Sequence, residues 1–157
     1  MCKIRFGPSG NSESFYADGL KNTEQAAKWL ADKGLGAFEY SFGRGTNMSA
    51  AKAGLIGKKM AEYGVAVSAH APYYINLANP DPTMIEKSFG YILNTAEKVR
   101  MMGGDRIIFH PASVGKDGDR QSALARTHEN MRRLAEEVVR TGNDDLIFCP
   151  GTMGKIN

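Results

Sequence analysis

The chain has few cysteines and no long hydrophobic stretch, and each shortage excludes a class of protein. Its two cysteines, Cys2 and Cys149, are too few for a disulfide framework and too far apart for a zinc-binding CxxC pair. No apolar run approaches the roughly 20 residues that span a bilayer, and the N-terminal segment lacks the hydrophobic stretch of a signal peptide. We therefore expect a cytoplasmic protein that has no membrane partner.

An excess of charge of either sign is also missing. The 20 Lys and Arg residues against 17 Asp and Glu give a formal net charge of +3. Such a balance permits contact with phosphates but lacks the strongly basic character of a dedicated nucleic-acid binder. With 157 residues, of which 42% are hydrophobic, the chain is long enough to bury a sizeable core. We expect residues 1–157 to form a single domain.

Short apolar segments alternate with amphipathic helical stretches along the chain. The segments that have the pattern of strands are residues 4–6, 37–40, 65–69, 106–109 and 146–149. The helical stretches between them lie at residues 23–33 and around the apolar stripes 53–63, 85–99 and 124–138. Because parallel neighbours need a crossover and a helix is the usual one, this order predicts a parallel sheet with helices packed outside it.

Two architectures fit this alternation, and the pattern alone does not choose between them. One is an open doubly wound sheet, and the other is a (β/α)8 barrel of the TIM type, which typically needs about 250 residues. In both, functional residues gather in the loops at the carboxyl ends of the strands. The loops after the predicted strands are therefore where a site is expected.

Two of the three histidines each follow a predicted strand directly. His70 ends the segment VSAH, and His110 ends IIFH. Because neighbouring strands lie about 4.8 Å apart, matched strand ends would direct both imidazoles at one metal ion. The alternative is a local hydrogen bond at each strand end. His128 falls inside a predicted helix and is interpreted as a surface residue.

Other polar and aromatic residues lie in the same set of loops. Arg44, between two glycines, places a cation where it can meet a phosphate. Tyr73 and Tyr74 follow His70, where an aromatic ring can stack in a nucleic-acid gap or simply pack beneath the loop. The sequence contains no Ser-His-Asp order, phosphate-binding GxxxxGK motif or HExxH motif.

Two sequence motifs carry a family resemblance. Residues 68–78 (SAHAPYYINLA) followed by residues 109–113 (FHPAS) resemble the endonuclease IV family of apurinic/apyrimidinic (AP) endonucleases, which are xylose isomerase-like TIM barrels. Residues 150–155 (PGTMGK) resemble the next motif of that family. The resemblance implies an α/β fold of the (β/α)8 TIM-barrel type. About the first five strands and four helices of such a barrel would lie in this chain, as its N-terminal part.

The resemblance also implies a function. Members of that family are phosphodiester hydrolases that use three zinc ions (Zn2+). They cut double-stranded DNA on the 5′ side of abasic sites in base excision repair. His70 and His110 match two of the zinc ligands, and no catalytic residue is assigned beyond the metal ligands. Tyr73 matches a position that enters the DNA at the lesion, and Arg44 lies in the loop that inserts a similar side chain.

The chain departs from the family pattern at Gly151. Relatives that share the motif of residues 150–155 are expected to carry a zinc-bridging glutamate at this position. The remaining ligands belong to the second half of the family's barrel, so the ligand set here is incomplete. We expect little or no DNA cutting by this chain, and self-association through exposed sheet edges. Two alternatives remain: a metal-dependent sugar isomerase or epimerase of the xylose isomerase-like barrels, with Glu39 as base or ligand, and a non-catalytic binding or assembly fragment.

Overall fold

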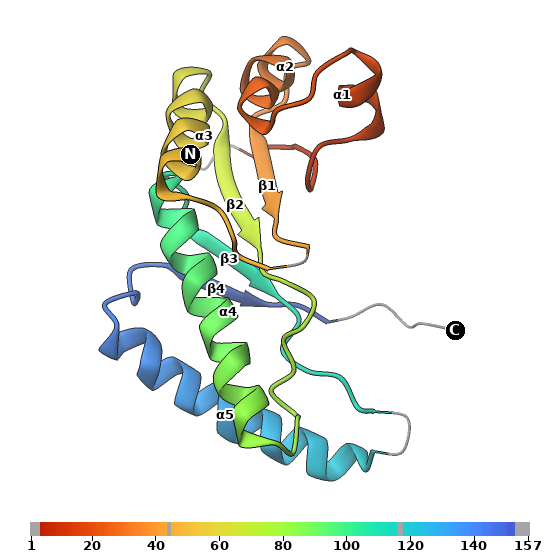
Figure 1. Ribbon diagram of the computed structural model, residues 1–157, viewed down its shortest axis with the longest axis vertical. Helices are drawn as coiled ribbons and strands as arrows, with labels where there is room; N and C mark the ends of the chain where they lie inside the picture. The colour runs from red at the N-terminus through yellow and green to blue at the C-terminus, as the bar shows by residue number, and fades with distance from the viewer. Residues whose placement is uncertain (1–3, 44, 116–117, 153–157) are drawn as a thin grey trace.

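The computed structural model describes residues 4–43, 45–115 and 118–152. In chain order the elements are α1 (Glu13–Ala17), the 3-10 helix η1 (Thr23–Gln25), α2 (Ala26–Asp32), β1 (Ala37–Ser41), α3 (Ala50–Glu62), β2 (Ala66–His70), α4 (Pro82–Met101), β3 (Arg106–Phe109), α5 (Arg120–Arg140) and β4 (Ile147–Pro150) (Figure 1). Among the helices of these ranges, none combines the length and the hydropathy needed to cross a membrane.

The four strands form one parallel sheet in the order β1-β2-β3-β4. A doubly wound sheet reverses its strand order at a switch point, whereas a barrel adds each new strand on the same side of the last. The sequential order therefore belongs to the barrel type, and the sheet matches part of a TIM barrel. Figure 1 shows α3, α4 and α5 following one another along one side of the sheet, as the outer helices of a barrel do.

Local signals in the sequence explain where the long helices begin and end. The residue before each of α3, α4 and α5 accepts a hydrogen bond from a first-turn backbone N–H through its side chain, as the N-caps Ser49, Asp81 and Asp119. Soon after each helix ends, a glycine adopts a positive φ, namely Gly64, Gly103 and Gly142. These stops return the chain to the next strand after only a few residues.

The strands present different residues to their two faces. Phe38, Val67 and Ile107 are buried on the side of the helices, in one core cluster that includes Ile92 and Val99 of α4. Because side chains alternate along a strand, the residues between them point to the opposite face. His70 and, just beyond β3, His110 have the alternation of this inner face.

The predicted strand at residues 4–6 was wrong. Ile4 and Phe6 are 78% and 72% exposed, and the oxygen of Phe6 accepts hydrogen bonds from the backbone of Gly36 and Ala37. Two residues further on, Pro8 has no N–H to donate to a ladder. The segment therefore meets β1 only through separate hydrogen bonds and an isolated bridge between Ser9 and Glu39.

Helix α1 was not predicted from the sequence, in which no strand or helix was assigned to residues 7–22. The side chain of Ser12 accepts a hydrogen bond from the backbone N–H of Phe15, 3.3 Å away, and the Phe15 ring is buried in the core. A helix of five residues is too short to show an amphipathic period, so only the capping serine signalled it. The described ranges thus hold four strands and five α-helices, whereas five strands and four helices were expected from the sequence.

Strand β4 lies at one end of the strand order, and its residue Ile147 is 45% exposed. An exposed strand edge presents unpaired backbone groups that favour association. Self-association of this chain stays a prediction.

Two glycines of α3 test how closely this helix packs. A Cβ on Gly57 would lie 2.7 Å from backbone atoms of Met102, whereas a Cβ on Gly54 would meet nothing within 4 Å. We expect Gly57→Ala to lower the free energy of unfolding by about 1–3 kcal/mol through overpacking. Gly54→Ala is expected to raise it by about 0.5–1 kcal/mol through helix propensity. Urea unfolding followed by the fluorescence of Trp29, the single tryptophan, measures both; equal effects would contradict the close approach.

Candidate metal centre

The two histidines singled out from the sequence lie side by side. His70 is the last residue of β2, and His110 directly follows β3. In the parallel register His70 is paired with Ile108, so His110 stands two residues further along the neighbouring strand. The centroids of the two imidazole rings are 5.0 Å apart, with the ring planes inclined at 55°. The sheet brings together two side chains that are 40 positions apart in the sequence.

Each imidazole is oriented by a backbone carbonyl. Nδ1 of His70 lies 2.8 Å from the oxygen of Ala71, and Nδ1 of His110 lies 3.2 Å from the oxygen of Gly151. A carbonyl oxygen only accepts hydrogen bonds, so each contact assigns the ring proton to Nδ1. Nε2 is then left with a lone pair, the tautomer that binds a metal ion. The local hydrogen bond and the metal-binding role are therefore compatible.

The two imidazoles supply only part of a metal site. Over the described ranges, no group of three or more His, Cys, Asp or Glu side chains is placed to hold an ion. Gly151 adjoins His110, and a Cβ built on it would lie 3.8 Å from Nδ1 of that ring, an ordinary contact distance. The position has room for a side chain but provides no carboxylate. The imidazoles fit a zinc ion as two of its usual four ligands.

Glu39, the candidate base or ligand of a sugar isomerase, lies on β1 away from this pair. It is paired in register with Ser68, two residues below His70 on β2. The residue is half-buried, and its carboxylate accepts an exposed 2.6 Å hydrogen bond from the hydroxyl of Ser9. The carboxylate thus has a partner in the N-terminal segment and does not join the two histidines in a cluster.

Tyr73 and Tyr74 have different surroundings. The Tyr73 side chain is 70% exposed, and its ring centroid lies 5.9 Å from that of His70. Tyr74 is 56% exposed and lies 6.2 Å from the ring of Tyr91 on α4. Tyr73 is therefore an exposed aromatic surface beside the imidazoles, whereas Tyr74 neighbours a helix. Arg44 lies outside the described residues.

Asn76 lies within the motif that contains His70, but no role was predicted for it from the sequence. Its side chain accepts a hydrogen bond from the backbone N–H of Ser113, 3.2 Å away, in the loop that follows His110. The one feature of the sequence that could have drawn attention to Asn76 is its place between two apolar residues, Ile75 and Leu77, which the structure shows to be buried. Such a residue needs hydrogen-bond partners, but the pattern does not say which ones.

Comparisons with known proteins agree with this architecture. Residues 27–146 match the family model described as "Xylose isomerase-like TIM barrel". A protein named probable endonuclease 4 from Mycoplasmoides gallisepticum is 36% identical over 74 residues, which are 47% of this chain and 24% of that protein. Across the curated relatives matched, the chain spans 24–40% of their length.

Two solved structures have similar folds at low sequence identity. The D-psicose 3-epimerase from Clostridium cellulolyticum matches with a TM-score of 0.66 and 15% identity, over 83% of this chain and 47% of the other. The endonuclease IV from Thermus thermophilus matches with a TM-score of 0.51 and 21% identity, over 72% and 42%. Both likenesses concern the fold.

Proposed function

Because this chain belongs to the xylose isomerase-like TIM-barrel family, whose members are typically metal-dependent, we propose that it carries part of the zinc site of an AP endonuclease. The reaction would be hydrolysis of a DNA phosphodiester on the 5′ side of an abasic site. The observation that carries the proposal is the histidine pair itself. The ring centroids of His70 and His110 are 5.0 Å apart, and Nδ1 of each ring is hydrogen-bonded to a backbone carbonyl. Sequence likeness to proteins named probable endonuclease 4 supports a DNA substrate.

The residues present would serve this reaction by binding and orientation. A zinc ion, when bound, activates water and neutralises phosphate oxygens. His70 and His110 would hold it through Nε2, and the carbonyls of Ala71 and Gly151 would keep the rings from rotating. Tyr73, exposed beside His70, would stack in the gap that a missing base leaves in the duplex. That stacking would hold the lesion's backbone phosphate against the imidazoles.

A sugar 3-epimerase is the second candidate function. It is favoured by the fold likeness to D-psicose 3-epimerase and by the half-buried Glu39 on the inner face of the sheet. Against it, the Glu39 carboxylate is bound by Ser9 and does not cluster with the histidines. An exposed Tyr73 has no evident task in a closed sugar pocket. The endonuclease function uses both the histidine pair and this tyrosine.

DNA binding separates these functions even where the chain does not cut. We expect the chain to bind a duplex with one tetrahydrofuran abasic-site analogue more tightly than the intact duplex. Tyr73→Ala is expected to remove about 1–3 kcal/mol of that binding, which is a roughly 5- to 150-fold loss, because stacking is lost. Tyr74→Ala, which changes a similarly exposed ring on the same loop, is the matched control and should have little effect. Fluorescence anisotropy at one fixed salt concentration measures the affinity of the native chain for both duplexes and that of each variant for the abasic duplex.

Equal affinity for abasic and intact duplexes, or equal losses in the two tyrosine variants, would count against the endonuclease function. Conversion of D-fructose by the metal-loaded chain would favour the epimerase. Absence of both DNA binding and sugar conversion would favour the non-catalytic fragment. Little or no nicking of the abasic duplex is expected from this chain, because the described residues provide two ligands only.

A further inference from the structure

The two candidate ligands lie on strands that share little of their length. The register between β2 and β3 contains two residue pairs, against five between β1 and β2 and four between β3 and β4. His70 belongs to one of those two pairs, and His110 lies beyond the last of them. One further backbone hydrogen bond, from the N–H of Ala71 to the oxygen of Ile108 at 2.8 Å, joins the two strand ends. The strand pairing therefore stops short of His110 and of the loop that follows it. The loops must supply the rest of the constraint on the spacing of the imidazoles.

These loops, residues 71–81 after β2 and residues 110–115 after β3, are joined by the side chain of Asn76. Its Oδ1 accepts hydrogen bonds from the backbone N–H groups of Ser113, at 3.2 Å, and Ala78, at 3.0 Å. Its Nδ2 donates to the oxygen of Ser113 at 3.3 Å. One carboxamide thus pairs both backbone groups of Ser113, as a neighbouring strand would. A single backbone bond, from Leu77 N–H to the oxygen of Pro111 at 2.7 Å, adds to it.

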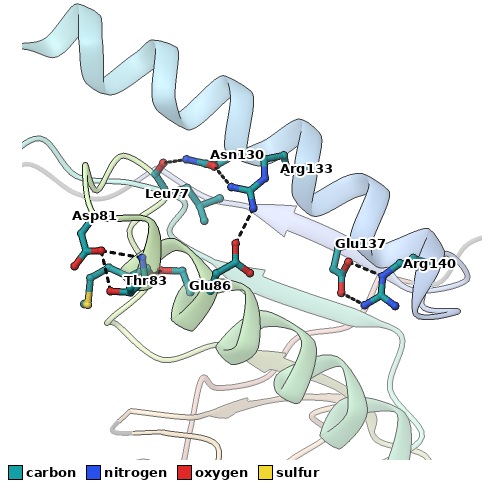
Figure 2. A network of polar contacts seen from close by, with 10 residues as sticks. Leu77, Asp81, Thr83, Glu86, Asn130, Arg133, Glu137 and Arg140 are labelled. Carbon is teal, nitrogen blue, oxygen red and sulfur yellow. Dashed lines mark hydrogen bonds and ion pairs between the residues drawn. The ribbon is translucent and has the colours of Figure 1, made fainter.

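Helix α5, which is itself paired with α4, also holds the first of these loops. The buried Asn130 of α5 donates from Nδ2 to the oxygen of Leu77 at 2.9 Å, and Arg126 donates to the oxygen of Ala78 at 2.7 Å. Figure 2 shows Asn130 accepting in turn from Arg133, which also pairs with Glu86 of α4. The loop 71–81 is therefore held by the helices, and Asn76 connects it to the loop that begins with His110.

We propose that Asn76 is a positioning residue whose carboxamide sets the spacing of His70 and His110 and thereby the affinity of the site for zinc. The proposal rests on the proposed zinc-binding role of the two histidines. Removing the carboxamide leaves the loop 110–115 with one backbone bond to its neighbour. His110, at the start of that loop, then samples positions in which its Nε2 and that of His70 no longer reach a common ion. Partners that orient a ligand typically account for about 10- to 100-fold in metal affinity.

The test compares two asparagines of the same loop. We expect Asn76→Ala to weaken zinc binding about 10- to 100-fold, measured by competition with a chromophoric chelator. Asn79→Ala is the matched control, because within the described residues the Asn79 side chain accepts a local hydrogen bond from the backbone of Asp81 and makes no bond to the loop 110–115. The zinc affinity of Asn79→Ala should equal that of the native chain. An unchanged affinity in Asn76→Ala, or an equal loss in both variants, would overturn the positioning role.

A second readout does not need zinc. In the metal-free protein, the ring nitrogen signals of His70 and His110 should move in Asn76→Ala, while those of the exposed His128 on α5 stay fixed. If the native chain binds no zinc, the proposed function fails, whereas moved ring signals still support positioning. Unmoved ring signals would overturn it. Should Asn76→Ala fail to fold, Asn76→Asp is the second variant. It keeps the acceptor for the N–H of Ser113 but places a carboxylate oxygen against the oxygen of Ser113, where Nδ2 donated, so it should show both effects.

Discussion

Replacing either His70 or His110 with alanine is expected to weaken zinc binding by more than about 100-fold. Loss of a partner that merely orients a ligand already costs about 10- to 100-fold, and loss of the ligand itself must cost more. The effect should be large here because the described residues offer no third His, Cys, Asp or Glu near the pair to compensate. Equilibrium dialysis against buffered zinc measures the dissociation constants.

The third histidine of the chain provides the control. His128 lies exposed on α5, so His128→Ala removes an imidazole without touching the site. We expect native zinc affinity from this variant. If all three histidine variants lost zinc to the same extent, the binding would be non-specific. If His70→Ala and His110→Ala both kept native affinity, the histidine pair would not be the metal site.

Gly151→Glu is expected to strengthen zinc binding by about tenfold or more by adding a carboxylate ligand to two imidazoles. The structure accommodates the change, since the new Cβ would lie 3.8 Å from Nδ1 of His110 and 3.9 Å from the oxygen of Phe109. The φ angle of Gly151 is not positive, so an L side chain is not strained there. Calorimetric titration with zinc should give a lower dissociation constant for the variant.

Thr152→Glu separates coordination from simple attraction. It adds the same charge one residue further on, at an exposed position. We expect this variant to gain far less than Gly151→Glu. Equal gains would show that the added negative charge, rather than a third ligand, draws the cation.

The sequence predicted those parts of the fold that local signals determine. Strand β3 occupies residues 106–109 as expected, because a short apolar run stands between a helix-ending glycine and a histidine-proline pair. The amphipathic stripes of α3, α4 and α5 and the glycines that follow them were also informative, since periodicity and positive φ are both local properties. The neighbouring positions of His70 and His110 followed from strand-end spacing.

The hydrogen bonds that hold the site were beyond such reasoning. Asn76 and Ser113 are separated by 37 residues in the sequence, and Asn130 and Leu77 by 53. No periodic pattern specifies a partner at such a distance, because the pairing depends on how two loops and a helix meet after the sheet has formed. The order β1-β2-β3-β4, which chooses a barrel over a doubly wound sheet, is likewise a property of the assembled strands.

The carbonyl that orients His110 belongs to Gly151, which directly follows β4, and not to β3, which the histidine itself follows. Whatever displaces the end of β4 therefore also moves the acceptor that selects the tautomer of this imidazole. If another strand pairs with the edge of β4 and shifts its end, and if a metal ion binds to the two histidines, the two equilibria are linked. By reciprocity, each would then change the affinity of the other by the same factor.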